Sequence, residues 1–593
     1  MSILLADNAT ALTAPSVSLA TLAFSGGDEV VLEPTDKVML VGANNSGKSR
    51  TIREIERKCS GGDEYNDLVV LKSIELKKIG TQEDLAAHVQ RRGKQTGTDF
   101  LIGNWSLSQY SFQYWNQPYL KAGLAAGFIK NLDAASRLAI CELQPSVAPS
   151  DVPTKPQQLL YRDDVLMKQA STLFKRAFGR ELMIDFRGGS RIPMHIGTTP
   201  SGPGYEDRAS SLYSQAVSLQ PALHEQGDGM KSYAGILFEA VASGRDVLFI
   251  DEPEAFLHPP QARKLGEALS THVAGQLIVA THSSDILRGF LEGNKGKVRI
   301  LRIVRDGDKN KIYEANPASI EALWKTPVLR FSNALDAIFH DQAILCEDDS
   351  DCRLISSISD HIQTANQETW ADTAYVPMGG KAGIPKAAEI LRAIGVPVKA
   401  VFDFDLISER SSLQAAVEAF GANWVDVQLH WKRVVAAMND GEAPTASQIK
   451  AKIQDVLDRS REDMLPKKKD IDEAFKRKSP WAKVKEFGLD GVPNGHAREE
   501  CEALLKLLEA VGIYLVPSGE MESFCRSVGG HGPKFVTKVL TSVSLNDGRL
   551  QALRDFTARV HRGAAAPIES IGTIERQCER AAAKTTPAAV IAD

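Results

Sequence analysis

The chain has 593 residues, more than one hydrophobic core usually supports, so we expect at least two domains. With 43% hydrophobic and 24% charged residues, the composition is that of a folded globular protein, which excludes a largely disordered one. The formal charge of -5 excludes a histone-like polycation, but a local basic groove could still bind nucleic acid.

The sequence predicts no membrane segment. The apolar run over 247–250 is far shorter than the ~20 residues that a membrane span needs. Residues 1–24 lack the basic start of a signal peptide. The seven cysteines are scattered without a C-x-x-C pair, which argues against a disulfide framework and against a structural zinc site. We therefore expect a cytoplasmic protein.

A phosphate-binding loop is the sharpest local signal. A predicted strand over 37–41 leads into Gly-Ala-Asn-Asn-Ser-Gly-Lys-Ser, and a helical pattern follows over 50–58. This is G-x-x-x-x-G-K-S in the strand–loop–helix setting that the motif requires, although a glycine-rich turn before a helix is the plain alternative. We expect Lys48 to reach the β and γ phosphates of a nucleotide and Ser49 to bind Mg²⁺. Loop contacts to the nucleotide are expected from Gly42, Asn45 and Gly47.

The segment after this loop, over 60–220, is interpreted as an inserted helical or dimerisation region. It lacks the sustained heptads of a coiled coil. It carries a cluster of aromatic side chains whose rings could stack on bases, although a core or a dimer contact is the commoner role of such a cluster. The cluster consists of Trp105, Tyr110, Phe112, Tyr114, Trp115 and Tyr119.

Three later motifs fit the same nucleotide site. The strand pattern over 246–250 ends in Asp251, which suits Mg²⁺, and Glu252, which suits the base that polarises the attacking water. A second strand pattern over 276–281 ends at His282, which could bond the γ phosphate. Between them and the loop, 226–232 forms a glycine-rich helix start. A strand that ends in Asp-Glu is weak evidence alone and becomes strong behind a phosphate-binding loop. A lone histidine at a strand end is usually a solvated turn residue, and 226–232 could instead begin a capped surface helix.

The order of these motifs resembles the ATPase heads of the ABC superfamily, and is closest to the recombination, SMC-type and OLD (overcoming lysogenization defect) branch. In such proteins two heads sandwich ATP. The resemblance implies that Gly229 and Ser232 contact the nucleotide held by a second copy, so the chain would work as a homodimer or a higher homo-oligomer.

A second, acidic constellation begins near residue 340. Three predicted strands, over 342–346, 396–401 and 511–516, each lead into carboxylates. In open α/β sheets, ligands gather outside the carboxyl ends of the strands. Carboxylates without cysteine or histidine suit Mg²⁺ or Mn²⁺, and two such ions could clamp a phosphodiester. Acidic turns on a solvated face are the alternative. The carboxylates are Glu347, Asp351, Asp403, Asp405 and Glu522.

This spacing resembles a Toprim domain, and an ATPase head followed by Toprim resembles OLD nucleases and the nuclease subunit of Gabija antiphage systems. The resemblance implies that the five carboxylates are metal ligands, with Glu347, Asp403 and Asp405 catalytic, and that Lys534 is the family's downstream lysine. Two features depart from the pattern. The first strand ends in Cys-Glu-Asp-Asp-Ser-Asp instead of Val-Glu-Gly, and 406–510 is a long insertion before Glu522.

The predicted fold class is therefore α/β, an ABC-type P-loop ATPase head followed by a Toprim domain with a helical insertion. The predicted boundaries are 1–335 for the head, 336–560 for the Toprim domain and 561–593 for a tail. Basic clusters in the insertion could neutralise DNA phosphates, although a solvated helix face is the favoured interpretation, because nearby acidic residues partly cancel the charge. They are Lys432-Arg433, Lys467-Lys468-Lys469 and Lys476-Arg477-Lys478.

The leading functional hypothesis is an ATP-regulated, metal-dependent DNA endonuclease in antiphage defence, with ATP and Mg²⁺ or Mn²⁺ as cofactors. The resemblance to Gabija systems also allows a separate helicase-like or other defence partner. An alternative is a nucleotide-dependent sensor or scaffold whose Toprim domain binds nucleic acid or another effector without cutting. A third reading, a transporter or repair ATPase, is disfavoured because no coupling or coiled-coil segment is evident.

Overall fold

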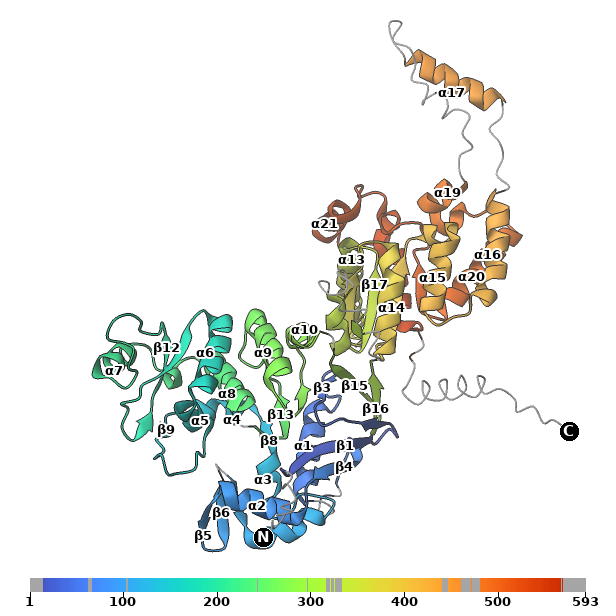
Figure 1. The fold of residues 1–593 in the computed structure, drawn as a ribbon. Helices are drawn as coiled ribbons and strands as arrows, with labels where there is room; N and C mark the ends of the chain where they lie inside the picture. The colour runs from blue at the N-terminus through green and yellow to red at the C-terminus, as the bar shows by residue number, and fades with distance from the viewer. Residues whose placement is uncertain are drawn as a thin grey trace, which may run out of the picture. The chain divides into compact units, whose positions relative to one another are not determined.

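The computed structural model describes residues 14–566 and 568 except for short gaps, which cover 62–64, 66, 103–104, 243, 296, 316–319, 322–324, 326–332, 440–445, 460–470 and 472–479. The described residues divide into two compact units (Figure 1). The first comprises residues up to 330 together with 393–395, and the second comprises 331–392 and 396–568. Among the helices described, none has the length and apolarity needed to cross a lipid bilayer.

The first unit is organised around a six-stranded sheet. Five strands run parallel, and the edge strand β16 is antiparallel to β15. Every residue of β3 and β14 is buried, as expected for parallel strands that are covered on both faces. In spatial order the strands are β16 (Lys309–Glu314), β15 (Arg299–Asp306), β3 (Lys37–Val41), β14 (Gln276–Ala280), β13 (Val247–Asp251) and β8 (Ile129–Leu132).

Two helices that follow the central strands pack unusually closely. α9 (Pro259–His272) comes after β13, and α10 (Ser284–Gly293) comes after β14, and the two lie side by side (Figure 1). A Cβ added at Gly266 of α9 would collide with the Ile286 carbonyl, and one at Gly289 of α10 would collide with the Arg263 carbonyl. Glycine therefore permits this contact, which fixes the two chain segments that leave the sheet edge.

The region over 60–220 differs from the helical insertion expected from the sequence. It supplies β8 to the central sheet, and β4 (Leu71–Ile79) pairs with β1 (Ser16–Phe24) in a separate antiparallel sheet that also contains β2 (Glu29–Val31). Its other strands form small antiparallel sheets, and its helices are interspersed among them. These strands are β5 (Lys94–Thr96), β6 (Asp99–Ile102), β7 (Trp105–Ser108), β9 (Gln144–Pro145), β10 (Glu181–Ile184), β11 (Arg191–Ile192) and β12 (Met194–Gly197), and the helices are α2 (Gln82–Arg92), α3 (Ala125–Phe128), α4 (Ala134–Ile140), α5 (Pro156–Arg162), α6 (Asp164–Phe178) and α7 (Ser211–Ser218).

The aromatic cluster of this region is mainly core. Trp105, Phe112 and Trp115 are buried, and all three belong to the same apolar cluster as the β3 side chains Val38 and Leu40. The ring of Trp115 packs against Phe128, with 5.3 Å between ring centroids. By contrast, Tyr110 is 65% exposed. Packing therefore accounts for most of these rings.

The second unit contains a four-stranded, wholly parallel sheet. Its strand order is β18 (Thr373–Pro377), β17 (Gln342–Cys346), β19 (Val398–Phe402) and β20 (Ile513–Leu515). α13 (Asp349–Asn366) and α14 (Ile384–Ala393) flank β17 in Figure 1. α21 (Gly532–Ser542) and α22 (Gln551–Arg562) pack on α13. This topology brings the carboxyl ends of all four strands to one edge of the sheet.

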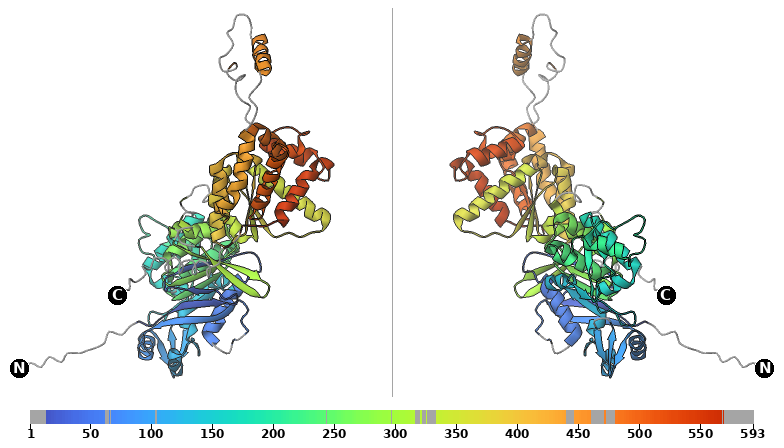
Figure 2. Two further views of the ribbon diagram at one scale, coloured as in Figure 1. Left: turned by 90° about the vertical axis from the view of Figure 1, so that its right-hand side faces the viewer. Right: turned by 90° about the vertical axis from the view of Figure 1, so that its left-hand side faces the viewer.

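The described residues of 406–510 form helices joined by turns and loops, which agrees with the mostly helical segment expected from the sequence. One of its helices is α17 (Ala446–Asp458), drawn in orange in Figure 2. The remaining helices are α15 (Arg410–Ala419), α16 (Trp424–Asn439), α19 (Pro480–Phe487) and α20 (His496–Glu509). α16 packs against α20, where Glu500 accepts hydrogen bonds from His430 and Arg433, at 2.6 Å each.

The ion pair between Arg433 and Glu500 involves one of the basic clusters that were expected to contact DNA. Arg433 is engaged by a carboxylate of its own unit, so it is not a free phosphate contact as folded here. The clusters Lys467-Lys468-Lys469 and Lys476-Arg477-Lys478 lie outside the described residues, as does the expected tail from 569 onward.

Candidate functional site

The phosphate-binding loop closes around its own lysine. Gly42 and Gly47 have φ of +139° and +107°, and a Cβ at Gly47 would lie 2.9 Å from a Val70 methyl carbon, so the loop path requires glycine at both positions. Lys48 opens α1 (Lys48–Gly61), and its Nζ donates to the carbonyls of Gly42 at 2.9 Å and Ala43 at 2.8 Å. Burial lowers the pKa of Lys48 to about 8, while nearby carboxylates oppose that shift.

Ser49 and Asp251, 202 residues apart in sequence, are in contact. The Ser49 hydroxyl donates to Asp251 Oδ1 at 2.8 Å. Parallel pairing of β13 and β3 with β14 explains the meeting, because it aligns the carboxyl ends of all three strands. Burial raises the pKa of Asp251 above its ordinary value. A hydroxyl and a carboxylate oxygen side by side are donors that fit Mg²⁺.

Glu252 is held in a strained backbone conformation. Its φ is +49°, in the left-handed region that costs a residue other than glycine about 1–3 kcal/mol. Arg137 of α4 spans this turn from inside the protein, since its guanidinium donates to the Asp251 carbonyl at 3.2 Å and to the Glu252 carbonyl at 2.9 Å. The Arg137 side chain is fully buried. The sequence analysis missed Arg137, because its role depends on the pairing of β8 with β13.

Glu254 joins the two strand ends next to the nucleotide loop. It accepts from the Thr281 hydroxyl at 2.8 Å and from the His282 backbone N–H at 2.7 Å, and burial raises its pKa. The pKa of His282 is lowered by burial and by the charge of Lys48, which favours the neutral imidazole. The Asp-Glu-Pro-Glu motif contained Glu254, but its spacing alone gave no role for the second glutamate.

A cavity of about 580 Å³ is lined by several of these residues, among them Lys48, Glu252 and His282. It is therefore large enough for a nucleotide and brings the expected phosphate-loop, Glu252 and His282 side chains to a common space. Its lining includes Asn44, Asn45, Gly47, Lys48, Ser49, Glu252, His282, Arg305 and Asn310.

The residues expected to reach a second copy are only partly exposed. α8 (Asp228–Ala242) begins at the glycine-rich motif, with Gly227 and Asp228 exposed and Gly229 half-buried. Ser232 is fully buried in the single chain, and its hydroxyl donates to the Ala255 carbonyl at 3.4 Å, so its contact with a second copy stays a prediction. As folded here, Ser232 points into its own unit, and only the preceding residues present a surface.

The acidic constellation converges at the carboxyl edge of the second sheet. Glu347 follows β17 and Asp403 follows the adjacent strand β19. The Asp403 backbone N–H donates to Glu347 Oε1 at 3.1 Å, and the Gly380 N–H donates to the Glu347 carbonyl at 2.7 Å. Gly379 and Gly380 turn the chain here with φ of +69° and +119°. Carboxylates separated by more than 50 residues are thus brought together by the sheet.

Burial first, and the neighbouring carboxylates second, raise the pKa values of these groups. Burial, followed by the charge of Glu347 and then that of Asp351, raises the pKa of Asp403 to about 9. Burial and Asp348 raise the pKa of Asp351 to about 7, with Glu522 contributing. Burial also raises the pKa of Glu347. Such crowding of hard oxygen donors is relieved by divalent cations, so the residues fit Mg²⁺ or Mn²⁺.

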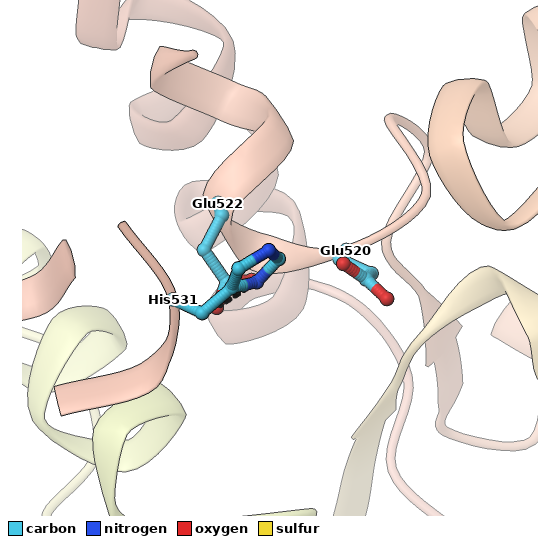
Figure 3. A group of neighbouring side chains, drawn as sticks. All are labelled: Glu520, Glu522 and His531. Atoms are coloured by element: carbon cyan, nitrogen blue, oxygen red, sulfur yellow. Dashed lines mark ion pairs between the residues drawn. The ribbon is translucent and has the colours of Figure 1, made fainter. Parts of the chain in front are cut away.

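A second group of donors borders this centre, beyond β20. Ligand atoms of Glu520, Glu522 and His531 all lie within 4.8 Å of one another (Figure 3). Glu522 was expected from the sequence, whereas Glu520 and His531 were not. Glu520 stands two residues before Glu522 in the Ser-Gly-Glu-Met-Glu motif, and His531 stands among glycines, a setting that gave no signal of its own.

Two lysines lie against the carboxylates. Lys381 Nζ is 3.6 Å from Asp405 Oδ1 and 3.5 Å from Glu409 Oε2. Lys485 Nζ, from the helical insertion, is 3.2 Å from Glu520 Oε1. Lys534, expected as the downstream lysine, is exposed at the start of α21, and its role stays a prediction.

Two family models match the chain. Residues 219–288 match "AAA domain, putative AbiEii toxin, Type IV TA system". Residues 338–405 match "Overcoming lysogenization defect protein-like, TOPRIM domain". The two matches include the strand ends that carry Asp251, Glu252 and His282 in the first unit, and Glu347 and Asp403 in the second.

Similar proteins include the Old nuclease of Escherichia phage P2, which is 25% identical over 170 residues. The match covers 27% of this chain and 28% of the length of that nuclease. Among solved structures, an Smc head bound to the C-terminal winged-helix domain of ScpA aligns with 50% of this chain and 97% of its own, at 10% identity and a TM-score of 0.32. The SMC head domain from Thermotoga maritima aligns with 51% of this chain and 100% of its own, at 12% identity and a TM-score of 0.27.

Proposed function

Because the chain is an OLD-like protein in which a P-loop ATPase domain precedes an OLD-like Toprim domain, we propose that it is an ATP-regulated, metal-dependent DNA endonuclease. The observation that carries this proposal is the meeting of Glu347 with Asp403 at the edge of the second sheet. Several buried carboxylates that raise one another's pKa do not stabilise the fold, so a structural role alone does not explain their grouping at this strand end.

The acidic centre supports hydrolysis of a phosphodiester. Divalent ions held there would activate water and stabilise the leaving oxygen. The chain's own contribution is positioning, because Glu347 is fixed by the Asp403 N–H while the Gly379–Gly380 turn holds the strand end next to it. Lys381 adds a positive charge beside Asp405, which favours the approach of a phosphate to an otherwise negative surface.

The first unit supports ATP binding and hydrolysis. Lys48 would contact the β and γ phosphates, Ser49 and Asp251 would hold Mg²⁺, and Glu252 would orient the attacking water. The neutral imidazole of His282 would donate to the γ phosphate. Backbone N–H groups of the loop, including those at Gly42, Asn45 and Gly47, complete the anion site.

The proposal includes assembly and biological role. Two heads would pair across ATP through the exposed start of α8 near Gly229, giving a homodimer or a larger homo-oligomer. Nucleotide state would then control the nuclease. Similarity to OLD nucleases supports DNA as substrate, and with the resemblance to Gabija systems it supports a cytoplasmic role in defence against phage, with or without a helicase-like partner.

A plasmid cleavage assay of Asp403→Ala tests the proposal. We expect loss of at least about a hundredfold in Mg²⁺- or Mn²⁺-dependent cleavage, since a metal ligand is removed. Asp360→Ala, an exposed aspartate on α13, is the matched control and should cleave like the parent protein. Unchanged cleavage by Asp403→Ala would show that the acidic centre is not the nuclease site.

The second candidate is a nucleotide-dependent sensor that binds nucleic acid or another effector without cutting. One observation favours it, since Lys381 and Lys485 already neutralise part of the acidic centre. The same assay separates the two candidates when DNA binding is measured in parallel. Retained DNA binding with no cleavage under any metal or nucleotide condition supports the sensor.

A further inference from the structure

The group of Glu520, Glu522 and His531 differs chemically from the rest of the acidic centre. The other carboxylates offer oxygen alone, whereas this group adds an imidazole nitrogen. Their ligand atoms lie within 4.8 Å of one another, a spacing that one ion could bridge with small side-chain movements. This inference rests on the proposed metal-dependent function and specifies which ion one position prefers.

Local backbone conformation explains why His531 lies there. Gly529, Gly530 and Gly532 have φ of +64°, +103° and +53°, so the chain doubles back between the short helix η8 (Met521–Cys525) and α21. A hydrogen bond from the Gly532 N–H to Glu522 Oε1, at 2.6 Å, stabilises this turn. His531 Nδ1 is then 3.5 Å from the same Glu522 oxygen.

The geometry leaves the group open to solvent on one side. The His531 side chain is 83% exposed, whereas those of Glu520 and Glu522 are 21% and 22% exposed. In Figure 3 the imidazole is turned toward the space between the two glutamates. The arrangement thus combines two partly buried carboxylates with one exposed imidazole.

We propose that Glu520, Glu522 and His531 form a mixed nitrogen–oxygen site that selects a divalent transition-metal ion over Mg²⁺. Imidazole is a good ligand for transition ions and a poor one for Mg²⁺, which prefers oxygen donors and retains its water. Mn²⁺ accepts both donor types. His531 is therefore the residue that determines selectivity, while the two glutamates supply charge to either ion.

Lys485 competes with the ion for Glu520. Its ammonium is 3.2 Å from Glu520 Oε1 and must withdraw when a cation binds that oxygen. Lys485 is more than half exposed, so this withdrawal returns its charge to water at little cost. Competition of this kind weakens binding of Mg²⁺ and Mn²⁺ alike, which separates the effect of Lys485 from that of His531.

The test is metal binding to the full chain without DNA. Mn²⁺ affinity is measured by electron paramagnetic resonance of the free ion, and Mg²⁺ affinity by competition. We expect His531→Ala to weaken one Mn²⁺ position about tenfold or more while changing Mg²⁺ affinity less than about twofold. Lys485→Gln should strengthen both. His496→Ala, an exposed histidine of the same unit, is the matched control and should change neither.

Nitrogen coupling provides the direct signature. Electron spin echo modulation of bound Mn²⁺ should show an imidazole nitrogen in the parent protein and in His496→Ala, and should lose it in His531→Ala. An absent coupling in the parent protein, or equal losses of Mn²⁺ and Mg²⁺ affinity, would overturn the inference.

Parallel plasmid cleavage distinguishes this inference from the proposed function. If Asp403→Ala loses cleavage while His531→Ala leaves metal selectivity unchanged, the nuclease proposal stands and the inference fails. If nitrogen coupling is present but no metal or nucleotide condition yields cleavage, the inference stands and the nuclease proposal fails.

Discussion

At the scale of single residues, the nucleotide site depends on a side chain that no motif contains. Arg137 is fully buried, and its guanidinium bridges the carbonyls of Asp251 and Glu252. Glu252 has a positive φ, so the turn needs support from its surroundings. Arg137 is not among the residues that line the cavity, so we assign to it the positioning of the proposed water-orienting carboxylate.

Replacing Arg137 by Lys should impair hydrolysis more than binding. A single ammonium cannot reproduce the planar fork that spans two carbonyls. We expect kcat for ATP hydrolysis to fall about tenfold or more, with KM and nucleotide affinity changing less than about threefold. Arg176→Lys, in a surface ion pair with Glu267, is the control. Hydrolysis at the parental rate would remove Arg137 from this role.

Asp403 should destabilise the fold when no metal is bound. Its folded pKa is about 9, above the value of about 3.9 expected when unfolded. The folded state therefore binds the proton more tightly, and its stability falls as pH rises between these two values. Asp403→Asn should raise the melting temperature in EDTA at pH 8 by a few degrees, about 1–3 kcal/mol, and should flatten the decline between pH 6 and pH 9.

Thermal melts across this pH range provide the check. Asp360→Asn, exposed on α13, should leave both the melting temperature and its pH dependence unchanged. A lower melting temperature for Asp403→Asn at pH 8 would mean that the carboxylate is favourably paired in the metal-free protein.

At the scale of elements, the sequence predicted the short apolar strands that end in acidic residues. Mostly apolar runs form the strands before Lys48, Asp251, His282, Glu347 and Asp403, because parallel strands are buried on both faces. Their common edge then placed the expected carboxylates together.

The elements that the sequence did not reveal depend on long-range pairing or on turns. β8 reads Ile-Lys-Asn-Leu, which lacks an apolar run, yet it completes the central sheet beside β13. Arg137 and His531 acquire their roles only after such pairing or after a glycine turn brings them back. Ser232 is buried in the single chain, and its contact with a second copy stays a prediction, because a motif indicates a helix start but not which of its side chains face outward.

The α9–α10 contact should be sensitive to one added methyl group. A Cβ at Gly289 meets the Arg263 carbonyl, which is backbone and cannot rotate away. Gly289→Ala should therefore destabilise the protein by about 1–3 kcal/mol in urea denaturation and reduce ATP hydrolysis, because these helices fix the strand ends. Gly548→Ala, where a Cβ meets nothing within 4 Å, should leave stability nearly unchanged. Equal stability of the two variants would contradict the close packing.

At the scale of the whole molecule, two chemical centres occupy two compact units. The Ser49–Asp251 pair belongs to the first and the Glu347–Asp403 pair to the second. Each is assembled within its own unit, at the carboxyl ends of neighbouring parallel strands, by residues distant in sequence. If ATP controls the nuclease, a change in the first unit must reach the second. We propose that nucleotide binding and the pairing of two heads produce that change.

Replacing Lys48 by alanine should affect ATP hydrolysis in the first unit without affecting metal binding in the second. Lys48→Ala should abolish ATP hydrolysis, because the loop loses its phosphate-binding charge. Mn²⁺ binding by the second unit should stay within about twofold of the parent protein, since its ligands are assembled locally. ATPase assays and Mn²⁺ titration measure the two properties on the same preparation. A parallel loss of Mn²⁺ binding would mean that the centres do not form independently.

Cleavage of circular plasmid DNA by Glu347→Gln tests the central claim most directly. The substitution keeps the shape of the side chain and removes one negative charge from the centre. With Mg²⁺ or Mn²⁺, and with or without ATP, the parent protein should cut in at least one condition and Glu347→Gln in none. Equal cutting by both proteins would contradict a metal-dependent nuclease centre at this sheet edge.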